Sequence, residues 1–575
     1  MKRTTLSLAV AALCSNAAYA VPQTGTSTRV VIGGATAIQT STQNAVIDNL
    51  CAAGSDIDVF SGSDHWNVAC EIDSSFGAAA GTTVLFSKNN GGSGQGATSV
   101  EVPVAVEVLS PTSTCVAASV PVQSTPKGTS FDAWVCDGSG GSTEVLENIN
   151  PDWGVSDVEP TLFTGPLSIL DTDGVTPVPF PAGGQLDSRA TASLPFGMVA
   201  TLSLYQALQA VQFPAGSDCN PDAALGGSDD GSITGSIAGN GIRDEYEAYA
   251  TDSAQPVSFD GSGAHIPETP DSKGYADQPH RVGDTRACMP TISMTEARSM
   301  LRGDYTTWEQ FKVGGSSLFA SAAGKPWAPD PGVNNFVLCR RIQGSGTHAT
   351  IASQILRTQC DVQASVMAEP GFNFPQIILG NQGSSNLGEC LDDLETKRAN
   401  EQGLGVKAWG VGYQSMEKNP DLEEAYRFLK IDGQSPDLKN FVEADYWIFG
   451  ATTVNRNDDN NDGAGEYFNP VGFFPAVDQM FERLVAELSD PSNLTDLNAG
   501  LGHPFGWGGF TGTKLAGVDT LPSFPFDPNP LSGDVPLQSL THVNPSTGVS
   551  NQCFGPALRS VGGAIAAPAD EADAK

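Results

Sequence analysis

Short apolar runs alternate with segments of helical periodicity along most of the first 490 residues. Val30-Val31-Ile32 predicts a buried strand, followed by the turn Gly33-Gly34-Ala35-Thr36 and a helix-like run over residues 37–50. The run from Phe336 to Cys339 predicts a second buried strand, and helical spacing extends from His348 to Leu356. Strands that alternate with helices in this way predict an α/β fold with mixed, largely parallel sheets.

Four further segments extend this pattern. Residues 82–86 predict a strand that leads into the glycine-rich stretch 89–96, for which a flexible loop is one interpretation. Ser293-Met294-Thr295-Glu296 is a capping box that opens a helix ending at Gly303. Residues 444–454 predict an apolar strand, and residues 476–488 an amphipathic helix.

The N-terminus has the features of a secretory signal peptide. Lys2 and Arg3 precede an apolar run over residues 6–13, and Ala18-Tyr19-Ala20 predicts cleavage after residue 20. Cys14 could indicate a lipoprotein signal, but lipid attachment requires a small residue before the cysteine, and Leu13 stands there. No later stretch reaches about 18 uninterrupted apolar residues, so we expect a periplasmic or secreted product with no membrane span after cleavage.

Composition narrows the classes of partner. The formal net charge of −36 argues against nucleic acid and anionic membranes, but not against a small anion bound in a cleft. Ten cysteines remain after cleavage, an even number that predicts disulfides whose pairing the sequence does not reveal. No spacing indicates zinc and no cofactor is expected. The loops 239–247 and 458–463 leave calcium open as a minority interpretation, although Asn469 replaces the acidic twelfth position of an EF-hand.

The connection between residues 340 and 347 carries the strongest candidate chemistry. A tight turn at Gly344 and Gly346 aims backbone N–H groups, two hydroxyls and a helix dipole at one point beside Arg341. These are the groups of an oxyanion site. The chain has only six histidines and no Gly-x-Ser-x-Gly nucleophile elbow, so we do not expect an enzyme.

Three segments in order resemble the periplasmic phosphate-binding proteins of ABC importers. They are Gly33-Gly34-Ala35-Thr36, the stretch Asp152 to Pro160, and the stretch Arg340 to Thr347. The resemblance implies a periplasmic-binding-protein-like fold of two α/β lobes joined by crossing strands, with ligand held in the cleft between them. Residues 51–81, 97–150, 212–285 and the C-terminal tail have no counterpart, so loop-rich insertions would enlarge the fold.

The resemblance also assigns roles to nine residues. Those that would bind phosphate are Thr36, Ala37, Ser93, Asp157, Arg341, Gln343, Ser345, Gly346 and Thr347. Asp157 would accept a hydrogen bond from a protonated ligand oxygen, although an aspartate at a strand end can also simply cap a turn. The second acidic acceptor of the family is replaced by Gln343, which can accept or donate and so softens the demand for a protonated ligand.

The chain is therefore expected to divide into five parts: a signal peptide (1–20), the N-terminal part of lobe I (21–211), a loop-rich insertion (212–285), lobe II (286–440), and a return to lobe I with a C-terminal extension (441–575). The expected function is binding of inorganic phosphate, or a similar tetrahedral oxyanion, for uptake through an ABC importer permease. The alternative is the same fold reused as an extracellular structural or adhesive protein.

Overall fold

The computed structural model describes residues 28–221, 284–457, 474–490 and 502–512, with short gaps inside these ranges. It also describes five isolated two-residue strands, at 19–20, 258–259, 265–266, 540–541 and 557–558. The calcium-like loops, most of the 212–285 insertion and most of the tail lie outside the described residues. Among the described residues, no helix has the length and apolar character needed to cross a bilayer.

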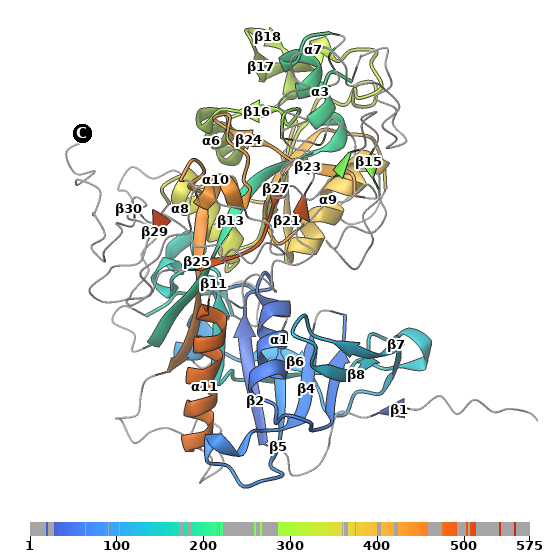
Figure 1. Ribbon diagram of the computed structural model, residues 1–575. Helices are drawn as coiled ribbons and strands as arrows, with labels where there is room; N and C mark the ends of the chain where they lie inside the picture. Colours follow the sequence, from blue (N-terminus) through green and yellow to red (C-terminus); the bar gives the residue numbers. More distant parts are fainter. Residues whose placement is uncertain are drawn as a thin grey trace, which may run out of the picture.

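One mixed sheet runs through both halves of the molecule (Figure 1). In the N-terminal half, β2 (Thr28–Gly34) pairs in parallel with both β5 (Thr83–Lys88) and β10 (Trp153–Ser156). In the other half, they are β19 (Phe336–Arg341), β21 (Gln376–Asn381) and β22 (Gly410–Ser415). Because the carboxyl ends of parallel strands share one edge, each half gathers its strand-to-helix turns on one side.

Two long antiparallel strands connect the halves. Strand β13 (Leu186–Thr201) pairs with β25 (Phe449–Asn457) through Pro195 and with β22 from Phe196 to Ala200. The ladder shifts register between Ala190 and Ser193, where Thr452 binds the backbone of Ala192. Strand β25 also pairs with β10, so this ladder crosses from one lobe to the other. The two-lobed α/β fold expected from the sequence is confirmed, whereas the exact domain boundaries stay a prediction.

Within the described residues, six helices of nine residues or more flank the sheet. They are α1 (Gln39–Asn49), α3 (Leu202–Gln212), α6 (Met294–Arg302), α8 (Gly346–Ile355), α9 (Ser384–Thr396) and α11 (Phe474–Ser489). The predicted capping box of α6 is present, with Ser293 Oγ accepting from Glu296 N and Gly303 ending the helix. Every residue of α8 is buried, which explains its weak amphipathic pattern.

Inserted hairpins widen the sheet on the N-terminal side. Strands β3 (Ile57–Ser61), β4 (Trp66–Glu71), β7 (Cys115–Ser124) and β8 (Ser130–Val135) extend it beyond β5. Most of their pairs are antiparallel, which is why the whole sheet is less parallel than expected. Disulfides fasten both insertions, Cys51–Cys70 and Cys115–Cys136. Two more, Cys219–Cys288 and Cys339–Cys390, make four cysteine pairs in the described part of the chain, and the predicted disulfides are present.

One predicted strand began too early. Residues 444–454 were expected to be extended, but β25 starts at Phe449. The short helix α10 (Leu438–Val442) precedes it, and Ala444 takes a φ of 69°, so the chain is still turning there.

The remaining described elements are short. The helices and strands are α2 (Thr98–Glu101), α7 (Leu318–Ser321), β1 (Tyr19–Ala20), β6 (Val106–Leu109), β9 (Leu146–Ile149), β11 (Ile169–Leu170), β12 (Pro177–Val178), β14 (Ser258–Phe259), β15 (His265–Ile266), β16 (Thr291–Ile292), β17 (Lys312–Val313), β18 (Ser316–Ser317), β20 (Gly371–Asn373), β23 (Tyr426–Phe428), β24 (Lys430–Ile431), β26 (Gly502–His503), β27 (Gly506–Trp507), β28 (Thr511–Gly512), β29 (Leu540–Thr541) and β30 (Ala557–Leu558). Single turns of 3-10 helix lie at Ser74–Phe76, Ser139–Gly141, Pro160–Leu162, Gly165–Leu167 and Trp308–Gln310.

Candidate functional site

Strand-to-helix turns from the two halves touch at one point. The amide of Gly94, in the turn after β5, donates to Gly344 O, in the turn after β19, at 2.8 Å. A Cβ on Gly346 would lie 2.1 Å from Ser93 Oγ and 2.9 Å from Asp157 Cβ. Only glycine fits such an approach. Residues 91–96 are therefore packed between the halves instead of forming an open loop.

Asp157 follows β10 at this contact. Ser93 Oγ donates to Asp157 Oδ2 at 3.0 Å and accepts from the Asp157 amide at 3.0 Å. The side chain is 3% exposed, and its Oδ1 has no hydrogen-bond partner. Burial raises the pKa of this carboxyl to about 6, although the Ser93 hydrogen bond and the charge of Arg341 oppose the shift. Its oxygens accept from no backbone N–H, so turn capping does not explain this aspartate.

Arg341 ends β19 and is 2% exposed. Its Nε and Nη2 donate to Gln382 O at 3.0 and 2.6 Å, and Nη1 donates to Ser384 Oγ at 2.7 Å. Burial lowers the pKa of Arg341 to about 10, so the group stays cationic at neutral pH. Because these partners are a carbonyl and a hydroxyl, the cation is hydrogen-bonded only to neutral groups, and three of its five N–H donors are used.

A cavity of about 490 Å³ lies beside this cluster, between the two halves. The start of α1 supplies Thr36 and Ala37 to its wall, and the start of α9 supplies Ser384 and Ser385. The N-cap residues of these helices offer no capping side-chain oxygen: Ile38 for α1 and Gly383 for α9. Two helix N-termini thus border one cavity, the arrangement that favours an anion, and at α1 the amide of Gln39 donates to Thr36 O at 3.1 Å.

The nine sequence-predicted residues fall into three groups. Two line the cavity, Thr36 and Ala37. Four form or adjoin the buried contact, Ser93, Asp157, Arg341 and Gly346. The others lie along the turn after β19, where Ser345 Oγ accepts from His348 N at 3.3 Å as the cap of α8, Thr347 is buried and Gln343 is half-buried. Ser345 is thus occupied by its own helix in this structure.

Three polar residues at the site were not predicted. Ser384 follows a glycine at a strand-to-helix turn, the same local pattern as Gly344-Ser345, so the sequence did carry a signal for it. Lys88 ends β5 and is fully buried, with Nζ donating to Gly34 O at 2.7 Å and Asn89 O at 2.9 Å. Burial lowers the pKa of Lys88 to about 7.

Glu417, the third of them, follows β22 and lines the cavity. Burial raises the pKa of its carboxyl, and Ser415 Oγ donates to it at 3.1 Å. Nothing local in the sequence marks this residue, because its position depends on how β22 pairs. Among the described residues, no group of histidine, cysteine and carboxylate side chains could hold a metal ion.

No protein-family model and no curated protein matches this chain. Solved structures similar to it include a protein assigned as a phosphate ABC transporter substrate-binding protein, with bound phosphate, from Clostridium perfringens (10% identity, 84% of this chain and 99% of that chain, TM-score 0.32). Two others are PstS from Borrelia burgdorferi (9%, 83% and 99%, 0.28) and an ABC-type phosphate transport receptor from Vibrio cholerae (12%, 59% and 78%, 0.23).

These names belong to the family that the sequence motifs resemble. Identities of 9–12% and TM-scores below 0.5 support no statement about ligand or mechanism. The contacts, burial and charges of this chain itself must therefore carry any assignment of function.

Proposed function

We propose that this chain is an exported, non-catalytic binding protein that holds inorganic phosphate, or a similar tetrahedral oxyanion, between its two lobes. The observation that carries the proposal is an unbalanced set of polar groups. The starts of α1 and α9 line the cavity, and beside it lie the buried cation Arg341, which donates to Ser384 Oγ, and Asp157, whose Oδ1 has no partner. An anion satisfies the donors, and a proton on that anion satisfies the carboxylate.

Each group has a distinct role in this arrangement. The first turns of α1 and α9 donate backbone N–H groups to ligand oxygens, and Arg341 contributes its two remaining N–H donors. Asp157 accepts a hydrogen bond from a protonated oxygen, which hydrogen phosphate offers at pH 7 and sulfate does not. Gln343 can rotate its amide to accept or donate, so it adds no firm rejection of sulfate to that of Asp157.

The biological setting is part of the proposal. The signal-like N-terminus and the disulfides fit a protein outside the cytoplasm. A permease of an ABC importer is the partner that would receive phosphate from such a carrier.

Calorimetry on the chain from Val21 onward tests the ligand. Phosphate should bind at pH 7, and sulfate should bind far more weakly. Asp157→Asn turns an acceptor into a group that can donate to any oxyanion, so sulfate affinity should rise about tenfold relative to phosphate. Asp304→Asn, an exposed aspartate beside α6, is the matched control and should change neither affinity. Absence of phosphate binding by the folded wild type would reject the proposal and favour the structural or adhesive alternative.

A further inference from the structure

The cavity between the lobes is much larger than phosphate needs. Its volume of about 490 Å³ equals that of roughly sixteen water molecules at ~30 Å³ each. Inorganic phosphate has five non-hydrogen atoms and would occupy only the end bordered by the helix starts. Ligand sites of ~300–1,000 Å³ normally hold an organic molecule. The remaining volume is large enough for an organic group attached to the phosphate.

The extra walls come from parts of the chain outside the phosphate-binding motifs. The β3–β4 hairpin contributes residues 61–63, 65 and 66, the β7–β8 turn contributes Pro126, and the C-terminal region contributes Phe510. Glu144 holds the hairpin tip in place, because the amide and hydroxyl of Ser63 both donate to its carboxylate at 3.0 and 2.8 Å. These insertions form a fixed wall that faces the starts of α1 and α9.

The lining of the cavity suits hydroxyl groups. Gln43 and Asn44 of α1 present amides, each of which offers both donors and an acceptor. Trp66 also lies in the wall, is 2% exposed, and its Nε1–H has no hydrogen-bond partner. A buried indole donor without an acceptor costs free energy that a ligand oxygen would recover.

Charge in the wall is nearly balanced. Lys418 Nζ lies 3.8 Å from Glu417 Oε2, so the pair offers little net charge to a second ionic group. A neutral, hydroxyl-rich moiety therefore fits this part of the cavity better than a second phosphate.

We infer that the physiological ligand is a phosphate monoester of a sugar, with the phosphoryl group at the helix starts and the sugar against Gln43, Asn44 and Trp66. The inference rests on the proposed function for the phosphoryl end and extends it with a separate sugar subsite. The phosphoryl group of a monoester can still carry the proton that Asp157 accepts.

Calorimetry with D-glucose 6-phosphate, inorganic phosphate and D-glucose tests the subsite. We expect glucose 6-phosphate to bind about tenfold more tightly than inorganic phosphate, because the sugar hydroxyls add hydrogen bonds in the subsite. Gln43→Ala and Trp66→Phe should each weaken glucose 6-phosphate about fivefold and leave inorganic phosphate unchanged. Asn49→Ala, on the same helix but outside the cavity, should change neither ligand.

The outcomes separate this inference from the proposed function. Binding of inorganic phosphate with equal or weaker binding of glucose 6-phosphate overturns the sugar subsite alone. Equal effects of Gln43→Ala on both ligands overturn it as well. If neither phosphate compound binds, both proposals fall. If glucose 6-phosphate binds and inorganic phosphate does not, the sugar subsite is supported and free phosphate is excluded as the ligand. Because Gln43 is half-buried on a helix surface, its variant keeps the test valid if Trp66→Phe fails to fold.

Discussion

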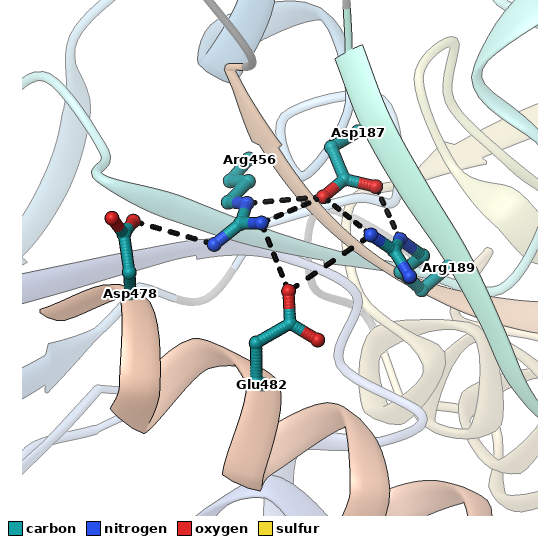
Figure 2. A network of polar contacts seen from close by, with 5 residues as sticks. All are labelled: Asp187, Arg189, Arg456, Asp478 and Glu482. Carbon is teal, nitrogen blue, oxygen red and sulfur yellow. Dashed lines mark hydrogen bonds and ion pairs between the residues drawn. The ribbon is translucent and has the colours of Figure 1, made fainter. Parts of the chain in front are cut away.

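Two clusters of charged side chains lie along the connection between the lobes, and they are built in opposite ways. The first joins the crossing strands β13 and β25 to α11 (Figure 2). Arg456 contacts Asp187 at 3.0 Å, Glu482 at 2.9 Å and Asp478 at 3.3 Å. Arg189 shares Asp187 and approaches Glu482 to 3.9 Å. We call these five residues (Asp187, Arg189, Arg456, Asp478 and Glu482) the hinge network, and each of its cations has a carboxylate partner.

The second cluster, at the cleft, lacks such pairing. Arg341 donates to a carbonyl and a hydroxyl, and Lys88 to two carbonyls. Asp157 receives one hydroxyl donor and leaves one oxygen without a partner. Burial raises the pKa of Asp157, whereas at Asp187 the hydrogen bonds and charges of Arg189 and Arg456 outweigh burial and lower the pKa.

The comparison separates charges that are paired with each other and stabilise the fold from buried charges whose missing partner a ligand would provide. In the hinge network every cation has a carboxylate partner, and the side chains are partly exposed. These ion pairs therefore hold α11 against the crossing strands but add little to the free energy of unfolding. The cleft cluster is buried and incomplete, which is costly unless another charged species completes it. In the proposed function, a phosphoryl group would supply both the missing anion for Arg341 and the missing proton for Asp157.

Removing one arginine from each cluster should give the largest contrast. Arg341→Ala should weaken phosphate binding by about 2–5 kcal/mol, because a desolvated charge-assisted contact is lost. Arg456→Ala should leave phosphate affinity unchanged and lower the free energy of unfolding by about 1 kcal/mol. Calorimetry and urea unfolding measure the two effects.

Arg341→Lys refines this test. It keeps the charge but loses the planar donors that bind Gln382 O and Ser384, so its affinity should fall between those of wild type and Arg341→Ala. A folded Arg341→Ala variant with wild-type phosphate affinity would place this arginine outside the site and remove the contrast.

The aspartates should respond to pH with opposite signs. In the folded protein the pKa of Asp157 is about 6 instead of 3.8, so the ionised carboxyl destabilises the ligand-free fold above pH 6 and has no effect below pH 4. Asp157→Asn should therefore stabilise the ligand-free protein by about 3 kcal/mol at pH 7, and by nothing near pH 4. Asp187→Asn should destabilise at pH 7, and its effect should fade as pH drops below 3.8.

Urea unfolding in phosphate-free buffer at pH 4 and 7 measures the difference for Asp157→Asn, and extending the series below pH 3.8 measures that for Asp187→Asn. A constant gain for Asp157→Asn across this range would mean that burial does not shift the titration of this carboxyl in the folded protein. The two clusters would then not differ in the way proposed.

The sequence was sufficient for the local parts of this site. Apolar runs and glycine turns located β2, α1, β19 and α8 within two residues of their observed ends, because strand and helix periods and tight turns are local properties. The same turns led to Thr36, Arg341 and Gly346 as candidates.

What sequence reasoning missed depends on contacts between distant segments. Glu417 and Lys88 are placed by strand pairing, and the parallel pairing of β3 with β8 joins two insertions that lie about 70 residues apart. The cavity wall has the same origin, since the β3–β4 hairpin reaches α1 only after folding. No local sequence pattern encodes contacts between such distant segments, just as none revealed which cysteines pair.

The smallest expected effect belongs to Glu482, which is half exposed and binds Arg456 and Arg189 across the hinge network. Glu482→Gln should lower the free energy of unfolding by about 0.5 kcal/mol at low salt, because an exposed ion pair gains little over its hydrated parts. At ~1 M NaCl the Debye length shrinks to about 3 Å and the difference should disappear. Asp478→Asn, on the same face of α11, is the matched control with a similarly small effect. Urea unfolding at both salt concentrations and phosphate calorimetry provide the measurements. A changed phosphate affinity in Glu482→Gln would show that the hinge network and the cleft are energetically coupled, and the division between structural charges and ligand charges would no longer hold.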